Sequence, residues 1–388
     1  MDTLRISTSR RLQGLVQSDI RRMTRECERV NGINLGQGIC DLPTPPLVRD
    51  GAIAAIQARK STYTHPEGAL ELRRAIATKL ARDNGLTADP LTEIVVTVGA
   101  SGAFAAAIHA LLDPGDGILL FEPYYGYHLN AAIVSGLEPQ YLRLAAPEFT
   151  LREEELRAAL RPNTRAVVVC TPSNPCGKMF DRAELEILAR VARERDLVVI
   201  TDEIYEYIRY DGRPHVSPAG VADLGERTVS IMGLSKTFSI TGWRLGYAVA
   251  KPELARAITL VNDLFYVCAP TPLQHGVAAG FAAPASFFRE LADDYAKKRE
   301  MTCTALERGG LEPIWPQGAY YVLADVSRLG FATAREAAMA ILERTGVATV
   351  PGSAFYSDRE GERFVRLCFA KEDDVLAEAC RRLERMRA

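Results

Sequence analysis

The stretch VSIMGLSKTFSITGWRLG, residues 229–246, decides how the rest of the chain is interpreted. It opens with Val229–Met232, a largely apolar run of the length expected for a strand buried on both faces of a sheet. Ser235, Lys236 and Arg244 follow that run. In open α/β sheets, ligands bind beyond the carboxyl ends of the strands. The stretch therefore predicts an α/β fold with a ligand site that contains a lysine and an arginine.

Upstream of this stretch, short apolar runs alternate with longer helical patterns. The helical pattern at 181–196 opens with Asp181 and Glu184 in capping-box spacing. Such alternation predicts βαβ units and a mostly parallel central sheet flanked by helices. The expected strands are Ile94–Val98, Gly117–Phe121, Ala166–Cys170 and Leu197–Thr201, and the other expected helices span 68–84 and 100–112.

The final third of the chain has a different order of elements, which is typical of an α+β unit. The expected elements are a long helix from about 286 to 308, a strand at 319–324, a helix near 334–343 and a strand at 364–369. We therefore expect a large domain over 49–285 and a smaller α+β domain over 286–388, which the N-terminal segment 1–48 completes.

The composition argues against several classes of protein. The 388 residues include 47 basic and 49 acidic side chains, a net charge of -2, which disfavours binding of nucleic acid or of an anionic membrane. The eight cysteines are scattered without C-x-x-C pairs or zinc spacing, so we expect reduced thiols and no metal site. The N-terminus lacks the apolar core of a signal peptide, and no apolar run reaches ~18 residues, so we expect a cytoplasmic protein without a membrane span.

Two further polar segments directly follow expected strands. TPSNP at 171–175 contains Asn174, and TDEIY at 201–205 contains Asp202 and Tyr205. Parallel strands direct their carboxyl ends to the same edge of a sheet, where ligands bind. We therefore expect these side chains and Lys236 to converge on one cleft.

A pyridoxal 5′-phosphate (PLP) cofactor needs groups of these kinds. A lysine joins its aldehyde as a Schiff base, a carboxylate keeps the pyridine nitrogen protonated, donors hold the ring hydroxyl, and an anion site holds the phosphate. The side chains that meet these needs in turn are Lys236, Asp202, the pair Asn174 and Tyr205, and the pair Ser235 and Arg244. Free N–H groups and the positive end of a helix dipole also attract anions where a strand meets a helix start. The residues at such a start are Gly99, Ala100 and Ser101.

Together these segments resemble the class I/II aminotransferases of the fold type I PLP enzymes, with aspartate and kynurenine aminotransferases as the nearest likeness. The resemblance rests on Ser235-Lys236 followed by Gly242, Arg244 and Gly246, on the Asn-Pro segment and on the Asp-x-x-Tyr segment. It covers nearly the whole chain. It implies transfer of an amino group between an L-amino acid and a 2-oxo acid by a homodimer with shared active sites, with Lys236, Asp202 and Tyr205 as catalytic residues.

The resemblance also implies roles for residues outside these segments. Tyr125, in EPYY at 122–125, would stack on the pyridine ring, and Tyr63 would reach the phosphate in the partner subunit. Gly38, in LGQG at 35–38, lies in the segment that binds the substrate carboxylate, where Asn174 also contributes. Arg366, in RLCF at 366–369, would hold the α-carboxylate with two parallel donors, a task that suits a guanidinium better than an ammonium.

Some residues depart from those common in the family, and the shared PLP set leaves other reactions open. The departures include Cys176, His128 and Ile20, which we expect to bear on substrate choice. A PLP-dependent lyase, a β- or γ-replacement enzyme, or a cyclising synthase with an S-adenosylmethionine-type substrate would use the same core residues. A PLP-binding transcription regulator is disfavoured by the slightly negative charge, and a nicotinamide dehydrogenase by the lack of G-x-G-x-x-G after an early strand.

Overall fold

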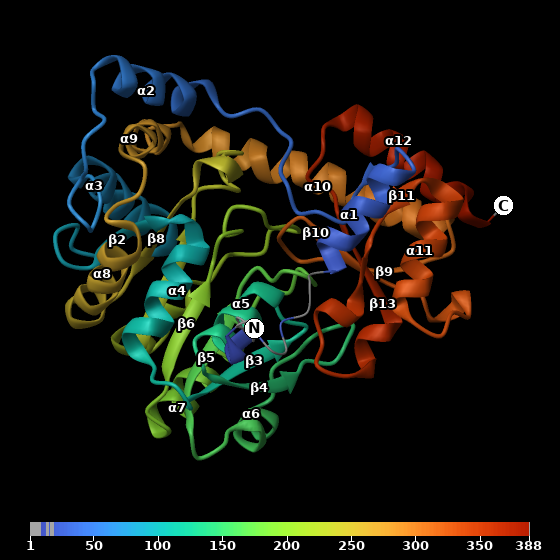
Figure 1. Ribbon diagram of the computed structural model, residues 1–388, viewed down its shortest axis with the longest axis horizontal. Helices are drawn as coiled ribbons and strands as arrows, with labels where there is room; N and C mark the ends of the chain where they lie inside the picture. Colours follow the sequence, from blue (N-terminus) through green and yellow to red (C-terminus); the bar gives the residue numbers. More distant parts are fainter. Residues whose placement is uncertain (1–8, 13–14, 16–18, 388) are drawn as a thin grey trace, which may run out of the picture.

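The computed structural model describes residues 9–12, 15 and 19–387, which form a large α/β part and a smaller part beside it (Figure 1). In the large part, seven strands form one sheet in which every neighbouring pair is parallel except the pairs that involve β8. In spatial order the strands are β2 (Ile94–Val98), β8 (Leu245–Val249), β7 (Thr228–Gly233), β6 (Val198–Asp202), β5 (Thr164–Cys170), β3 (Gly117–Glu122) and β4 (Glu138–Arg143). The expected α/β class with a mostly parallel sheet is confirmed.

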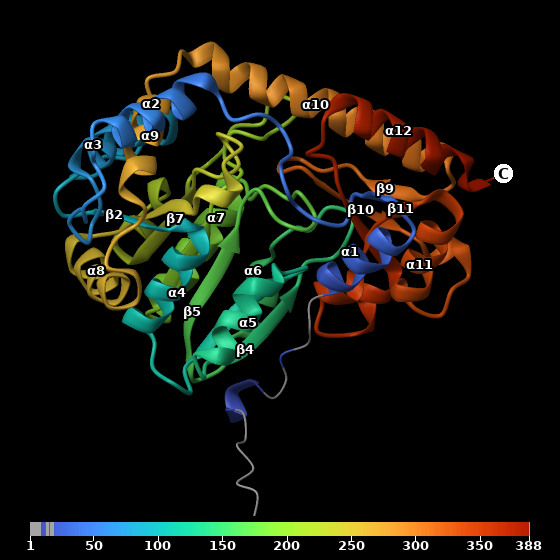
Figure 2. The same ribbon diagram turned by 45° about the horizontal axis from the view of Figure 1, so that its top comes forward.

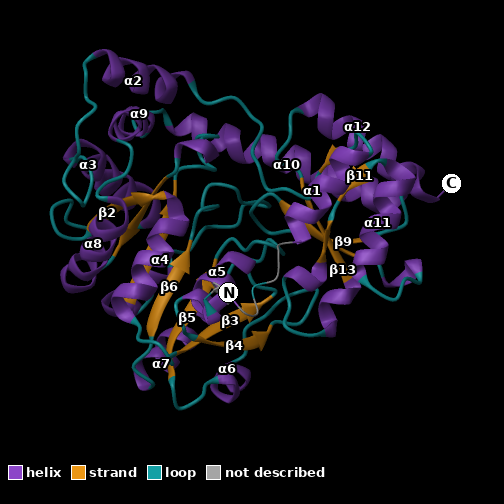
Figure 3. Ribbon diagram, viewed as in Figure 1, coloured by secondary structure: helices purple, strands orange, loops and turns teal. Residues whose placement is uncertain are grey.

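Helices cover both faces of this sheet. Successive side chains of a strand point to opposite faces, so apolar residues on both faces need a layer of helices to bury them. Val167 and Val169 of β5 pack in the layer that contains α7, whereas Ala166 and Val168 pack in the layer that contains α4. Figure 3 shows the strands gathered at the centre of each part with helices outside them. The helices of the large part are α2 (Pro46–Gln57), α3 (Leu70–Lys79), α4 (Gly99–Leu111), α5 (Gly126–Val134), α6 (Glu153–Ala159), α7 (Arg182–Glu194), α8 (Pro252–Tyr266) and α9 (Thr271–Gly280).

The predicted capping box at the start of α7 is confirmed. Glu184 N donates to Asp181 Oδ1 at 2.9 Å, and Asp181 N donates to Glu184 Oε2 at 3.0 Å. These two bonds satisfy backbone donors that a helix start otherwise leaves open. Among the described helices, none combines the length and the apolar character needed to cross a bilayer.

The smaller part is built on a four-stranded antiparallel sheet in the order β12-β13-β10-β9. In Figure 2, α10 runs from beside α9 into this part, where α12 lies along it. Strand β1 pairs in parallel with β11, so the segment around Ile33–Asn34 belongs to the smaller part together with the C-terminal residues. The elements are α1 (Asp19–Arg29), β1 (Ile33–Asn34), α10 (Ala285–Arg308), β9 (Glu312–Ile314), β10 (Tyr321–Asp325), α11 (Ala334–Thr345), β11 (Val347–Ala348), β12 (Val350–Pro351), β13 (Phe364–Cys368) and α12 (Asp373–Glu384).

The structure contains strands of the central sheet that the sequence did not predict, and it moves the start of one predicted strand. Strand β4 was not predicted, because its sequence EPQYLR alternates buried with exposed positions and has no continuous apolar run. Strand β8 was not predicted either, because its residues directly follow Arg244 and were interpreted only as part of the ligand motif. The strand expected at 319–324 begins later, at Tyr321, since Ala319 has a φ of +59° that no β-strand adopts.

Candidate active site

The predicted residues meet at a cavity beyond the carboxyl ends of β6 and β7. The cavity spans about 780 Å³, a volume that includes space open to solvent. Helix α4 directs its N-terminus into it, and α5 contributes a second wall. The sequence-predicted site residues that line the cavity are Ala100, Ser101, Tyr125, Asp202, Ser235, Lys236 and Arg244.

One end of the cavity is a cradle suited to an anion. Arg244 donates through Nη2 to Ser101 Oγ at 3.1 Å and through Nη1 to Thr241 O at 3.0 Å. Gly99 opens α4 with a φ of +71°, and a Cβ there would lie 2.6 Å from Arg244 Nη2. A Cβ at Gly246 would lie 2.5 Å from the backbone nitrogen of Ala100. The close packing here therefore depends on glycine at both positions. The Arg244 guanidinium, the Ser101 hydroxyl and the N-terminus of α4 together form a site suited to an anion.

Lys236 lies between this cradle and the N-terminal loop. Its Nζ donates to Gly38 O at 3.2 Å and sits 5.4 Å from the centre of the Tyr320 ring. Burial lowers the pKa of the Lys236 ammonium below its usual value, although nearby Cys368, Cys40 and Asp202 act in the opposite direction. A larger fraction of this amine is consequently neutral, which is the form that attacks an aldehyde.

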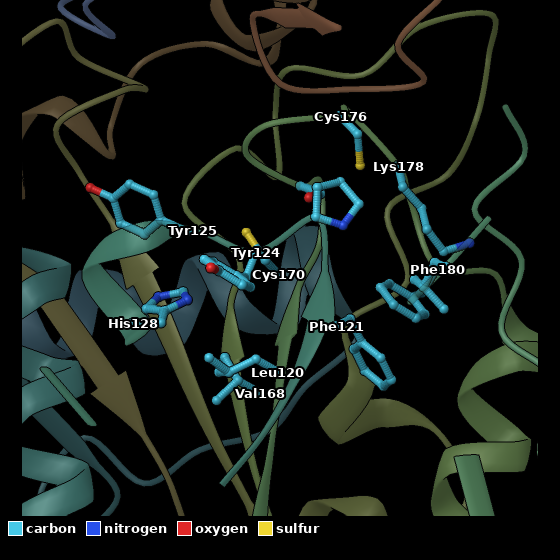
Figure 4. Close-up of a pocket in the computed structure, with 13 residues that line it drawn as sticks. Leu120, Phe121, Tyr124, Tyr125, His128, Val168, Cys170, Cys176, Lys178 and Phe180 are labelled. Carbon is cyan, nitrogen blue, oxygen red and sulfur yellow. The ribbon is translucent and has the colours of Figure 1, made fainter. Parts of the chain in front are cut away.

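Asp202 is buried and has a partner that the sequence did not reveal. Asp202 Oδ2 lies 3.1 Å from His128 Nε2, and Asp202 Oδ1 accepts from Ile204 N at 3.4 Å. The His128 ring meets Tyr125 edge-on at 5.1 Å and lies 4.4 Å from the ring of Phe104. Tyr125 and His128 also line a neighbouring pocket, which is drawn in Figure 4 and does not include Asp202 or Lys236. His128 thus fixes the orientation of the carboxylate expected to face the pyridine nitrogen.

Arg366 is nearly inaccessible, at 1% exposure, and is held by contacts on several sides. Its Nη1 donates to Asn174 Oδ1 at 2.9 Å, and its Nη2 donates to Gly36 O at 2.6 Å. Its Cζ lies 4.4 Å from the centre of the Tyr321 ring and 4.8 Å from that of Phe355. Its buried Nε has no hydrogen-bond partner within the described part of the chain. The arginine is therefore fixed in place with one buried donor unpaired, and it lies behind the wall of the cavity rather than on it.

The remaining predicted residues lie around this centre rather than on the cavity wall. Tyr205 is buried, and its hydroxyl donates to Tyr321 Oη at 3.3 Å. Gly38 leaves room for the same tyrosine, because a Cβ on Gly38 would lie 1.8 Å from Tyr321 Oη. Tyr63 is 80% exposed and does not line the cavity that the described residues of this chain enclose.

Cys176, which the sequence singled out, and His109 on α4 both have packing positions in the structure. Cys176 is buried in the apolar layer around α7, and burial raises the pKa of its thiol. His109 Nε2 lies 3.3 Å from Ser135 Oγ, and its ring meets Phe265 edge-on at 5.5 Å. Across the residues that the structure describes, no group of three or more histidine, cysteine, aspartate or glutamate side chains could hold a metal ion.

The donor set fits PLP. The cavity combines an anion cradle, a lysine with a lowered pKa and a buried carboxylate, which match the cofactor's phosphate, aldehyde and pyridine nitrogen. The glycine positions that would clash with Arg244 and with the start of α4 if they carried a Cβ support the same fit.

The chain is similar to known proteins along nearly its whole length. Residues 30–383 match the family described as aminotransferase class I and II. The chain is 33% identical to the probable N-succinyldiaminopimelate aminotransferase DapC of Mycobacterium tuberculosis, over 97% of this chain and 98% of that protein. It is 32% identical to aromatic-amino-acid aminotransferase 2 of Thermococcus litoralis, over 98% of both chains. The solved structure of the N-succinyldiaminopimelate aminotransferase from Mycobacterium tuberculosis superposes with a TM-score of 0.94, over 98% of this chain and 100% of that one.

The names of these relatives favour transamination over the lyase, replacement and cyclising reactions that the motifs alone left open. The geometry and the comparisons together assign the chain to the class I and II aminotransferases, PLP-dependent enzymes that transfer an amino group between an amino acid and a 2-oxo acid.

Proposed function

We propose that Lys236 is the lysine that carries the cofactor and moves the substrate proton in transamination of an L-amino acid. The observation that carries this proposal is that Lys236, Asp202 and Arg244 line one cavity. When bound, PLP supplies an aldehyde for the amino group and a ring that accepts the electrons of the broken Cα–H bond. Lys236 Nζ would take the proton from the substrate Cα, a task for which a lowered pKa is suited.

The surrounding residues hold the reacting groups in place. Asp202, oriented by His128, would keep the pyridine nitrogen protonated, and Tyr205 and Asn174 would hold the ring hydroxyl. The phosphate would be held by Gly99, Ala100, Ser101, Ser235 and Arg244, and Tyr125 would stack on the ring. Arg366 binds the α-carboxylate next to Gly38 and Asn174, where a carboxylate out of water needs a paired charge.

A half-reaction assay tests this assignment. The purified protein with bound PLP is mixed with single amino acids, and loss of cofactor absorbance and formation of the 2-oxo acid are followed. The parent should convert its cofactor stoichiometrically to the pyridoxamine form, and a 2-oxo acid should reverse the change. Lys236→Ala should stop the reaction, whereas Lys297→Ala, at an exposed lysine on α10, should leave it unchanged. Full activity of Lys236→Ala would remove Lys236 from the proposed role.

We also propose that the enzyme is a homodimer with shared sites. The C-terminal half of α8 exposes large apolar side chains, Leu260 at 68% and Leu264 at 78%, next to α4 and the cofactor cradle. The segment with Tyr63 is tied to α9, since Thr271 Oγ1 donates to Thr62 O at 2.7 Å. Exposed apolar surface of this kind is typical of a subunit interface. A second copy packed on it would bury these side chains and receive Tyr63.

Mixing two inactive variants tests the shared site. Lys236→Ala and Tyr63→Ala chains are unfolded together, refolded and assayed at a cofactor concentration at which neither alone is active. A random mixture of symmetric dimers should regain about one quarter of the parental sites, because each hybrid dimer contains one intact site. No recovery, in a mixture that sedimentation shows to be dimeric, would place Tyr63 outside the partner's site.

We further propose a cytoplasmic location and a division of the chain at 285/286. All eight cysteines are free thiols, which suits a reducing compartment. The division would leave 1–48 and 286–388 as the smaller domain, supported by the pairing of β1 with β11. Cell fractionation tests the cytoplasmic location, and limited proteolysis tests the division of the chain at 285/286.

A further inference from the structure

A second cavity adjoins the cofactor site on the side of α5. It encloses about 1600 Å³, including space open to solvent, and shares Tyr125 and Tyr127 with the cofactor cavity. Its opposite wall is the segment 353–357, which is tied to the large part because Tyr124 N donates to Phe355 O at 2.9 Å. Phe355 also lies against Arg366, with 4.8 Å between the arginine Cζ and the ring centre. A substrate held by Arg366 at its carboxylate would therefore have this space available for its side chain.

Six of the fifteen residues that line the second cavity are aromatic, and Asn130, Ser353 and Ser357 add uncharged polar groups. The rings of Tyr124 and Tyr141 lie 5.6 Å apart, and those of Tyr125 and Tyr127 stack at 5.3 Å. Burial raises the pKa of both Tyr124 and Tyr141, so their hydroxyls stay neutral at physiological pH. The other apolar or aromatic residues of the lining are Ile20, Leu129, Ala354, Phe355 and Tyr356.

The charges near this cavity do not favour an acidic side chain. Asp19 lies on the wall and is paired with Arg335, whose Nη2 is 3.0 Å from Asp19 Oδ1. Arg21 lines the rim and is exposed, and it is the one basic side chain among the described residues of the wall. An aspartate or glutamate side chain would leave water here without a buried cation as a partner, which is costly. A large apolar side chain would instead replace water against aromatic rings, which is favourable.

We propose that this cavity receives the side chain of the amino-acid substrate and that the enzyme prefers large, uncharged, apolar or aromatic amino acids. The inference rests on the proposed function, because it uses Arg366 as the carboxylate site. Ile20 and Leu129 act as specificity-determining residues that contact the side chain. The neutral hydroxyls of Tyr124 and Tyr141 leave room for polar atoms at the end of a long side chain, but they provide no charge.

Half-reaction kinetics with amino acids of different side chains test the preference. Phenylalanine should exceed aspartate in kcat/KM by about 100-fold or more, a range typical of discrimination by an apolar pocket, with alanine in between. A faster reaction with aspartate or glutamate than with phenylalanine would overturn the inference while leaving transamination intact. Failure of every amino acid, alanine included, would count against the proposed function itself.

A charge placed in the cavity tests its location. Leu129→Arg should lower kcat/KM for phenylalanine by about 10-fold or more, raise that for glutamate by a similar factor, and leave alanine within about threefold. Val134→Arg, on an exposed position of the same helix, should change none of the three values. Should Leu129→Arg fail to fold, Ala354→Trp narrows the cavity from the opposite wall and should slow phenylalanine alone. Equal losses for phenylalanine and alanine in the folded variant would show that the side chain binds elsewhere.

Discussion

Replacement of Arg366 by lysine should weaken binding of the substrate carboxylate and leave cofactor binding unchanged. The guanidinium is 1% exposed and lies between the rings of Tyr321 and Phe355, at 4.4 Å and 4.8 Å. Hydrogen bonds to Asn174 and Gly36 fix its plane. Lysine keeps the positive charge but presents a single ammonium group, so it cannot offer two parallel donors to a carboxylate.

The expected loss follows from the burial of this arginine. Truncation of one partner of a buried, hydrogen-bonded charge pair costs roughly 2–4 kcal/mol, so kcat/KM for an α-amino acid should fall by roughly 30- to 700-fold. The corresponding amine without the α-carboxylate makes no such pair. Its reaction should already be slow in the parent and should change by less than about threefold in the variant.

The assay compares the fastest amino acid with its decarboxylated amine in single-turnover half-reactions of both proteins. Cofactor content and the absorbance spectrum should be unchanged, because we propose that the phosphate is held by Arg244 and not by Arg366. Arg363→Lys is the matched control, since Arg363 is on the same segment but is 49% exposed in a surface ion pair, and it should react as the parent does. If Arg366→Lys slows the amino acid and the amine equally, Arg366 is structural and the reasoning is refuted.

The other predictions concern the cofactor contacts. Asp202→Asn should lower kcat by ~100-fold or more, about 2.7 kcal/mol, because the amide no longer keeps the pyridine nitrogen protonated; near-normal turnover would remove Asp202 from this role. His128→Asn should lower kcat by about 10-fold. If the double variant His128→Asn/Asp202→Asn is no slower than Asp202→Asn alone, His128 acts through the Asp202 carboxylate. Gly99→Ala should weaken PLP binding. The control Gly85→Ala, at a glycine with a similar φ but with nothing within 4 Å of an added Cβ, should cost only about 1 kcal/mol of stability. Equal PLP affinities of the two variants would show that the backbone at Gly99 does not help to bind the phosphate. Burial lowers the pKa of Lys236 in the folded, cofactor-free protein. Between that lowered pKa and about 10.5, the unfolded chain therefore binds more protons than the folded protein, and the free energy of unfolding should rise with pH in the parent relative to Lys236→Met. Denaturant unfolding of both proteins at several pH values measures this, and an equal dependence of the unfolding free energy on pH would show that the pKa of Lys236 is not lowered.

The strands that carry the site could be predicted because they are buried on both faces. Strands of that kind are continuous apolar runs, and the polar residues that interrupt them mark the edge of the sheet. Asp202 and Lys236 were therefore placed together correctly from the ends of β6 and β7. Strand β4 escaped prediction because it is at the edge of the sheet and alternates buried with exposed residues.

The contacts that complete the site depend on packing between elements distant in sequence. His128 reaches Asp202 only because α5 lies over the end of β6, and no local pattern specifies that placement. The aromatic rings around Arg366 come from β10 and from the segment before β13, which the sequence did not connect with the carboxylate. Residue-level chemistry was thus accessible from strand-end motifs, whereas orientation of the carboxylate and the shape of the side-chain cavity required the tertiary structure.

The proposed attachment of the cofactor to Lys236 is tested most directly by reduction of the PLP-loaded protein with borohydride, followed by digestion and mass spectrometry of the labelled peptides. We expect a single phosphopyridoxyl group, on Lys236, and no such group after the protein is first converted by an amino acid to the pyridoxamine form. A stoichiometric label on any other lysine would show that Lys236 does not carry the cofactor.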